Sequence, residues 1–472
     1  KDAVGDTCGV ALRISLEELR GKPSNNQSSE AHEVVELLSD APDLWDVKMD
    51  SSPTDCGASR FRQECAHEPI IDFVKKVTDK PVVGVGRFTS PDTMVSQIKR
   101  GVLDLIGGAR PSIADPFLPN KINEGREGDI RECIGCNICI SSWHDGVPVR
   151  CTQNATAGEE WRKGWHPERF EQPGSDDSIL IVGGGPAGLE AGLTAARRGY
   201  QVTIADKNTK MGGRLIYETK LPGLSEWGRV TDYRLNALKT MSNVSLYLDS
   251  DLGVDDILGL EHSRIGIATG AHWTKALYSS LEIAVGELNR PDVYTPDDLA
   301  SGMIPEGPVL VYDFDNYYLG GVIAESLALQ DLNVSYATPT GHASAWTIMT
   351  NELPFVHQSL EKSGVEVFTQ MLLHDFDGKK VTLSNIFTNK PISLAIKSVV
   401  IVGLRLPNDQ LYNQLMSRSS EFSQAGIKSV ERIGDASAPG ALVHAVYSGH
   451  EFARQLDRPP DELYLRDIPI AE

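Results

Sequence analysis

"ILIVGGGPAGLEAGLTAARRGYQVTIADK", residues 179–207, holds the elements of a nucleotide-binding fold in the order that such a fold requires. An apolar run predicts a buried strand, a helical stretch follows it, and a second strand ends at Asp206. Between the first strand and the helix stands G-x-G-x-x-G, formed by Gly183, Gly185 and Gly188. Glycines at this spacing let the backbone approach a pyrophosphate at the helix amino terminus, and the acidic side chain can accept from a ribose. We therefore predict a Rossmann-like domain that binds an adenine nucleotide.

Two later segments extend this domain. "IGIATGA" (265–271) and "ERIGDASAPG" (431–440) resemble the chain-crossing and flavin-contacting motifs of flavoproteins with two dinucleotide folds. Asp435 is the candidate contact to the pyrophosphate or ribitol of an FAD-like ligand.

A second strand–helix–strand pattern lies between these motifs, at residues 307–339. Asp313, Asp315 and Tyr318 stand where its three glycines would be. Two carboxylates at the mouth of such a site would repel a pyrophosphate, and three side chains would block its approach. We predict that residues 296–395 are a degenerate NAD(P)-like inserted domain that does not bind NAD(P)H, and that residues 178–295 and 396–472 form the FAD- or ADP-binding domain around it.

The first 130 residues alternate between strand and helix patterns. The expected strands are 8–15, 44–49, 80–88 and 102–111, and the expected helices are 31–40, 68–79 and 91–101. Apolar strands that alternate with helices indicate a parallel sheet buried on both faces. Four such units are half of a (β/α)8 barrel, so residues 1–130 are predicted to be a half barrel.

Residues at the carboxyl ends of these strands are candidates for a cofactor site, because barrel chemistry lies at that end. They are Arg13, Asp55, Gly86, Arg87, Gly107, Gly108 and Arg110. Glycine N–H groups with arginine after the last two strands indicate a phosphate site. The alternative is that the glycines only close tight turns and the arginines are solvated.

"CIGCNICISSWHDGVPVRC", residues 133–151, has the spacing C-x2-C-x2-C-x11-C. Cys133, Cys136 and Cys139 match three corners of an iron–sulfur cubane, and Cys151 supplies the fourth ligand. The segment 131–170 is therefore predicted to hold a [4Fe–4S] cluster. Zinc and a site without any ligand are the alternatives.

The amino-acid composition further limits the classes of protein to which the chain can belong. The 472 residues suffice for several domains, and 40% hydrophobic with 23% charged residues is typical of a globular protein. A formal net charge of −20 argues against binding to a nucleic-acid backbone, and no apolar run is long enough for a membrane helix. Seven cysteines, four of them clustered, favour a reducing cytoplasm over a secreted disulfide framework.

The stretches "IRECIGCNICIS" (130–141), "CTQNATAGEEWRKGWHPERF" (151–170) and "ARPSIADPFLP" (109–119) resemble the trimethylamine/dimethylamine/histamine dehydrogenase family of iron–sulfur flavoproteins. The resemblance covers nearly the whole chain. It implies that a barrel binds FMN, that an amine is oxidised to an iminium that is later hydrolysed, and that electrons pass singly from FMN to the cluster and on to an electron-transferring flavoprotein. It also implies ADP in the next domain and a homodimer.

The same resemblance gives roles to individual residues. Arg13 would lie by the flavin pyrimidine, and Gly86, Arg87 and Arg110 would hold the FMN phosphate, with Gly108 beside them. Asp55 matches an active-site aspartate, and its alternative is a turn or N-cap residue. Trp143 matches one wall of an aromatic bowl that receives a methylated ammonium, and its alternative is a core or cluster-shielding tryptophan.

Two departures from the family limit this assignment. Ser52 stands where the bowl has a second aromatic residue, which favours an N-methyl amine other than trimethylamine. The family's first four βα units are also absent, so we expect the chain to be a C-terminal fragment that is inactive alone. The alternative is that a separate chain supplies the other half of the barrel. The alternative functions are an NAD(P)H-dependent enoate or 2,4-dienoyl-CoA reductase and an inactive electron-transfer remnant.

Overall fold

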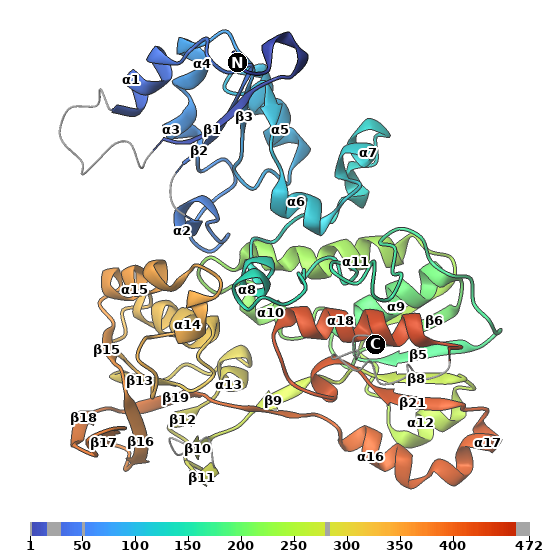
Figure 1. Ribbon diagram of the computed structural model, residues 1–472. Coiled ribbons are helices and arrows are strands. Elements are labelled where there is room, and N and C mark those ends of the chain that lie inside the picture. Colours follow the sequence, from blue (N-terminus) through green and yellow to red (C-terminus); the bar gives the residue numbers. More distant parts are fainter. Residues whose placement is uncertain (1, 17–29, 50–51, 279–283, 459–472) are drawn as a thin grey trace, which may run out of the picture. The chain divides into compact units, whose positions relative to one another are not determined.

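The computed structural model describes residues 2–16, 30–49, 52–278 and 284–458 (Figure 1). The chain divides into two compact units. The first comprises residues 1–158, 217–229 and 273–404, and the second comprises 159–216, 230–272 and 405–472. The boundaries of these two units differ from those of the four domains predicted from the sequence. The four-domain division therefore stays a prediction. Over the described ranges, no helix is both long and apolar enough to cross a membrane.

The first unit begins with the half barrel. Its sheet has the order β1-β2-β3-β4, with all neighbours parallel. The elements are β1 (Ala11–Ser15), α1 (Glu30–Leu37), β2 (Leu44–Lys48), α2 (Ser52–Asp55), α3 (Glu68–Ile71), α4 (Val74–Val77), β3 (Val82–Gly84), α5 (Pro91–Lys99), β4 (Leu105–Ile106), α6 (Ala109–Ala114) and α7 (Leu118–Asn123). The predicted parallel half barrel is thus confirmed.

Burial within this sheet follows strand position. Trp45 and Val47 of β2 and Val82 of β3 are fully buried in one core. The edge strands differ, since β1 alternates between exposed and half-buried residues and Leu105 of β4 is 48% exposed. The central strands β2 and β3 alternate between buried and half-buried residues, so one face of the sheet is fully buried and the predicted burial on both faces is not observed.

The predicted helix 68–79 is interrupted. Its hydrogen bonding breaks between α3 and α4, although Asp72 and Phe73 keep helical backbone angles. The helix ends before Thr78, which is extended.

The inserted lobe belongs to the same unit. Its five-stranded sheet has the order β12-β19-β13-β14-β15, and an antiparallel sheet β16-β17-β18 packs beside it in a shared core. The elements are β10 (Ala276–Tyr278), β11 (Ala284–Glu287), β12 (Val293–Tyr294), α13 (Pro296–Ala300), β13 (Val309–Asp313), α14 (Tyr318–Ala328), β14 (Val334–Ala337), α15 (Leu353–Lys362), β15 (Glu366–Phe368), β16 (Met371–Phe376), β17 (Lys380–Asn385), β18 (Pro391–Ala395) and β19 (Ser398–Val402). The predicted strand–helix–strand is β13-α14-β14.

The second unit is built on a parallel sheet of order β21-β8-β5-β6-β7. Its elements are β5 (Ser178–Val182), α9 (Pro186–Arg198), β6 (Gln201–Ala205), α10 (Leu215–Glu218), α11 (Arg229–Lys239), β7 (Val244–Tyr247), α12 (Val254–Gly259), β8 (Arg264–Ile267), β9 (Ala271–Trp273), β20 (Arg405–Pro407), α16 (Gln410–Ser417), α17 (Phe422–Ala425), β21 (Ser429–Arg432) and α18 (Leu442–Gln455), with the ends of α10, α11 and β9 reaching the first unit.

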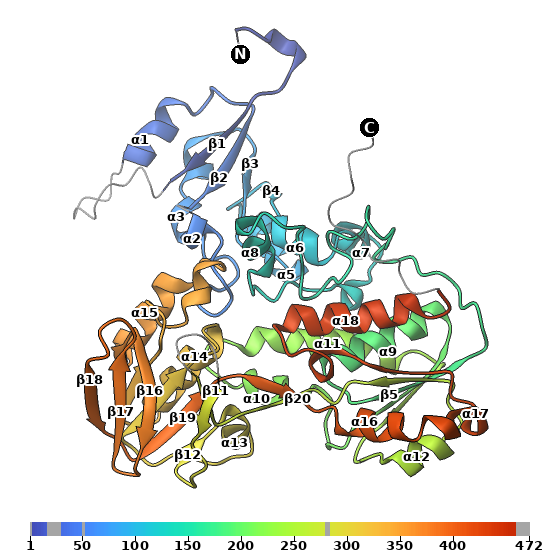
Figure 2. The same cartoon turned by 60° about the horizontal axis from the view of Figure 1, so that its bottom comes forward.

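Alternation along β5 explains the layers of this unit. Ile179 and Ile181 face a core shared with α9 and α18, whereas Leu180 and Val182 face one shared with α12 and α16. Figure 2 shows the two helix layers on opposite faces of the sheet. A strand apolar on both faces needs helices on both faces, which is the doubly wound arrangement.

Candidate cluster and cofactor sites

The four clustered cysteines lie on and around α8 (Ile138–His144) in the first unit. Cys133 and Cys136 precede the helix in a loop whose turn is made by Gly135, with φ +62°. A Cβ on Gly135 would stand 2.7 Å from the Ser59 backbone N, and Ser59 N–H donates to the Gly135 carbonyl at 3.0 Å. Glycine is therefore required both by the backbone angle and by the close approach of the loop that follows β2.

The thiols share a desolvated environment. Burial raises the pKa of Cys136 to about 12 and that of Cys151 to about 11, and it raises the pKa of Cys139 further. The other three thiols add to the rise at Cys139, so all four lie within electrostatic range of one another. All seven cysteines of the chain are free thiols, with no disulfide.

Hydrogen-bond donors point at these sulfurs. Gly135 N–H donates to Cys133 Sγ at 3.4 Å, and the Thr152 hydroxyl lies 3.3 Å from Cys136 Sγ. Backbone N–H groups of Gln153 and Asn154 lower the pKa of Cys151 by donating to its sulfur. Donors of this kind stabilise thiolates, and hydrogen bonds to sulfur are one of the means by which proteins tune iron–sulfur clusters.

The donor set consists of four thiols, which is the ligand set of a [4Fe–4S] cluster. Among the described residues, no three His, Cys, Asp or Glu side chains converge closely enough to hold one metal ion. A zinc site needs its sulfurs about 2.3 Å from a common ion, whereas in a cubane each thiolate binds a different iron. Four neighbouring thiols supply the number and kind of ligands that a [4Fe–4S] cluster needs, and the cluster itself stays a prediction.

Asn137 ties the start of α8 to two other segments. It has φ +57°, and its amide donates to the carbonyls of Cys56 (2.7 Å) and Thr350 (2.9 Å). Its Oδ1 accepts from Arg110 Nη1 at 2.6 Å, and the same nitrogen reaches the Gly57 carbonyl at 3.0 Å. Arg110, predicted to hold an FMN phosphate, thus joins the loop after β2 to the cluster segment; its contact with a phosphate stays a prediction.

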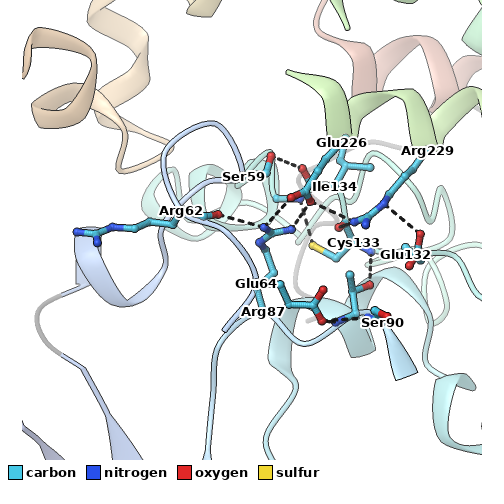
Figure 3. A network of polar contacts seen from close by, with 12 residues as sticks. Ser59, Arg62, Glu64, Arg87, Ser90, Glu132, Cys133, Ile134, Glu226 and Arg229 are labelled. Atoms are coloured by element: carbon cyan, nitrogen blue, oxygen red, sulfur yellow. Dashed lines mark hydrogen bonds and ion pairs between the residues drawn. The ribbon is translucent and has the colours of Figure 1, made fainter. Parts of the chain in front are cut away.

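A network of charged residues surrounds Cys133 (Figure 3). Arg87, whose side chain is 2% exposed, binds the Glu226 carboxylate through both Nη1 (2.5 Å) and Nη2 (3.1 Å). Arg229 shares that carboxylate at 3.1 Å, pairs with Glu132 at 3.0 Å, and donates to the Cys133 carbonyl at 3.5 Å. Arg87 was predicted to bind the FMN phosphate, and the structure shows that its guanidinium already has a carboxylate partner.

Of the remaining residues predicted for the flavin face, the two glycines lie near strand ends. Gly86 follows β3, and Gly108 precedes α6 after β4. Arg13 lies in the middle of β1, not at its end, and its guanidinium is 3.3 Å from the Asp46 carboxylate. Trp143 is 70% exposed on α8, which contradicts the alternative of a buried core tryptophan. The side chain of Ser52 lies outside the described residues.

Asp55 has a buried histidine beside it that the sequence analysis missed. His67 Nε2 lies 3.2 Å from the Asp55 carbonyl and 3.7 Å from its Oδ1. Because a carbonyl only accepts, Nε2 carries the proton, and burial lowers the pKa of His67 and favours its neutral form. Asp55 Oδ1 also accepts from Met49 N–H at 3.0 Å, which fixes the carboxylate at the end of β2.

The nucleotide site of the second unit has the geometry that its glycines predict. Gly183 has φ +112°, and a Cβ on Gly188 would stand 1.9 Å from the Gly183 carbonyl oxygen. Asp206 accepts from Gly184 N–H at 2.6 Å and from Asn208 N–H at 2.8 Å. Gly183, Asp206 and Asn208 line a cavity of about 850 Å³ at the carboxyl ends of β5, β6 and β8, which is large enough for a nucleotide.

Asp435 lines the same cavity but is already paired. Its Oδ2 lies 2.5 Å from Arg405 Nη1 and 3.5 Å from Arg214 Nη1, and its Oδ1 accepts from Gly440 N–H at 3.1 Å. Arg405 and Arg214 were not among the predicted residues, because nothing local in the sequence signals a pair that closes across 30 or more residues.

In the inserted lobe, Asp313 is fully buried at the end of β13, so it does not stand at the mouth of a site as the sequence analysis expected. It accepts from the Tyr336 hydroxyl and from Asn316 N–H, and burial together with Asp315 raises its pKa to about 7. A Cβ on Gly320 would stand 2.4 Å from Asp313 Cγ, so the carboxyl fills the space between strand and helix. The absence of NAD(P)H binding stays a prediction.

Comparisons with known proteins identify two domain families in the chain. The NADH:flavin oxidoreductase / NADH oxidase family matches residues 1–129, and an NAD(P)-binding Rossmann-like domain matches residues 181–250. The chain thus combines the barrel of a flavin-dependent oxidoreductase with a dinucleotide fold.

Among its relatives is dimethylamine dehydrogenase of Hyphomicrobium sp. (strain x), 37% identical over 96% of this chain and 66% of that protein. Histamine dehydrogenase from Rhizobium sp. 4-9 superposes with a TM-score of 0.95 at 44% identity, over 100% of this chain and 70% of that one. The 6-hydroxypseudooxynicotine amine oxidase of Pseudomonas geniculata N1 gives a TM-score of 0.92 at 47% identity, over 97% and 68%. The chain belongs to the trimethylamine/dimethylamine/histamine dehydrogenase family, and it spans about two thirds of the length of these relatives.

Proposed function

We propose that the chain serves an iron–sulfur flavoprotein that dehydrogenates a small amine at a C–N bond and passes the electrons to an electron-transferring flavoprotein. The observation that carries this proposal is the group of four neighbouring free thiols in the unit of the half barrel, three of them strongly desolvated, with hydrogen-bond donors at their sulfurs. Its relatives are named as enzymes of amine oxidation, which supports the substrate class. FMN, when bound, would take two electrons from the amine, and the cluster would carry them away singly.

The residues of this chain would act by holding and orienting. Cys133, Cys136, Cys139 and Cys151 would ligate the cluster, and Arg13 would present a fixed cation to the flavin. Asp55 would orient groups at the substrate from the position that Met49 and His67 give it. Trp143 would face the ammonium of the amine, since an exposed indole attracts a cation through its ring face.

The second unit is proposed to bind ADP in preference to FAD. In FAD-binding relatives of this fold, the acid at the position of Asp435 would contact the pyrophosphate or ribitol. Here both of its oxygens are engaged, by Arg405 and by Gly440 N–H. The Asp435 carboxylate is already paired with a guanidinium, so a hydrogen bond from a ribitol hydroxyl would add little to FAD binding. The second cation beside it, Arg214, lines the same cavity and would suit the terminal phosphate of ADP.

An anaerobic analysis of iron, acid-labile sulfide and released nucleotides tests these proposals on the purified chain. About four irons and four sulfides per chain with stoichiometric ADP is the expected result. Zinc in place of iron would contradict the electron-relay function, and FAD among the released nucleotides would contradict the proposed role of the Asp435–Arg405 pair. Amine-dependent reduction of an electron-transferring flavoprotein by a full-length family member carrying this sequence would test the activity itself.

A further inference from the structure

The network around Cys133 has a feature that neither phosphate binding nor structural bridging explains. Two guanidinium groups, those of Arg87 and Arg229, meet on one oxygen of Glu226, and the second of them reaches the Cys133 carbonyl. Burying an arginine is costly unless it is paired, and Arg87 is almost completely buried, with its Nε unpartnered among the described residues.

The backbone of Arg87 is also held in an uncommon conformation. Its φ is +55°, in the left-handed region that disfavours residues with a side chain. Thr89 and Ser90, next along this loop, both donate their N–H groups to Glu64 Oε1 at 2.6 and 3.0 Å. These two hydrogen bonds hold the loop after β3 in a conformation that directs the Arg87 guanidinium towards Glu226 (Figure 3).

The same loop holds Cys133 from its other side. Cys133 N–H donates to Thr89 Oγ1 at 2.8 Å, while its carbonyl accepts from Arg229. Burial lowers the pKa of Arg87, but the hydrogen bonds and charge of Glu226 raise it, and the charges of Cys133 and Glu64 add a smaller rise, so the pKa is raised overall. The Cys133 sulfur and the Arg87 guanidinium therefore interact electrostatically. Fixed charges therefore lie within electrostatic reach of this thiol.

We propose that Arg87 and Arg229, joined through Glu226, set the reduction potential of the cluster bound at Cys133. This inference rests on the proposed function, because it requires the cluster. Reduction adds one negative charge to a group that four thiolates already make negative, and buried cations nearby stabilise the reduced form more than the oxidised form. Glu226 opposes them, so the arginines and the glutamate act with opposite sign.

A reduction titration of the anaerobic holoprotein, followed by the EPR signal of the reduced cluster, tests this proposal. Arg229→Gln should lower the midpoint potential, and Glu226→Gln should raise it, each with the iron content of the unsubstituted protein. Arg100→Gln is the matched control, because Arg100 forms an exposed ion pair with Glu68 in the same unit, and it should leave the potential unchanged.

Opposite shifts are the result that a merely structural role would not produce, since a disturbed site would move both variants in one direction. Unchanged potentials at full iron content, or shifts of the same sign, would overturn the proposal. If Arg229→Gln loses iron, the Glu226→Gln variant alone tests the proposal. A higher midpoint potential of its cluster would then support the proposal, and an unchanged potential would overturn it. An unsubstituted protein without iron would overturn the proposed function and this inference with it, which separates the two failures.

Discussion

Protonation of the Asp313 carboxyl affects the stability of the folded chain. Its pKa is about 7 in the folded lobe, against 3.8 for an ordinary aspartate. Between these values the unfolded chain binds fewer protons than the folded one, so the carboxyl makes stability fall as pH rises from about 4 to 7, with no further change above. Glu352, with a pKa of about 7, acts in the same direction.

We expect Asp313→Asn to remove up to ~1.4 kcal/mol per pH unit of this decline between pH 5 and 6. Urea unfolding at several pH values measures it. Asp377→Asn is the control in the same lobe: the pKa of Asp377 is lowered by the Lys379 and Lys380 N–H groups, so its contribution changes only below that window. An identical pH slope in Asp313→Asn and the unsubstituted chain would refute the assignment.

Gly188 is the glycine with the least room for a side chain. Because its Cβ would stand 1.9 Å from the Gly183 carbonyl, Gly188→Ala must displace the loop that would hold the pyrophosphate. We expect loss of bound nucleotide and a destabilisation of about 1–3 kcal/mol, the usual cost of overpacking. Gly259→Ala, at the end of α12 with open space around it, should change neither nucleotide content nor melting temperature.

At the level of elements, α8 depends on the residue that precedes it. Asn137 combines a left-handed backbone with side-chain bonds to Cys56 and Thr350. Asn137→Ala should lower the free energy of unfolding by about 2–4 kcal/mol, since the backbone preference is lost and the carbonyls of Cys56 and Thr350 lose the amide that donates to them. Asn389→Ala keeps only the backbone part of the change, because Asn389 is exposed with φ +55°. Equal losses in the two variants would show that the Asn137 side-chain bonds contribute nothing.

Elements were predictable from the sequence where their cause is local. The glycine loop, β5 and α9 follow from spacing and apolar runs alone, as do the four strands of the half barrel. Contacts between distant segments could not be predicted from the sequence. Glu226 lies 139 residues from Arg87, and Arg405 lies 30 residues from Asp435. No periodicity connects such pairs, so the predicted phosphate and ribitol contacts could not anticipate that their charges are already paired. Asp313 was expected at a site mouth for the same reason.

Across the whole chain, the two candidate sites belong to different compact units. The four cysteines lie in the first unit and the nucleotide cavity lies entirely in the second. Each site is built from contacts within its own unit, so loss of one ligand should leave the other bound. We therefore expect Cys151→Ser to reduce iron content sharply while released ADP stays at the level of the unsubstituted protein.

Gly188→Ala should give the reverse, with iron retained and ADP lost, and Cys8→Ser, at an exposed cysteine, should change neither. Iron and nucleotide analyses on the same four preparations decide the matter. Joint loss of iron and ADP in either variant would mean that one ligand is needed to fold the other site, and the two units would then be a single cooperative structure. Independent loss would show that the cluster and the nucleotide bind without each other, as the separate contact sets require.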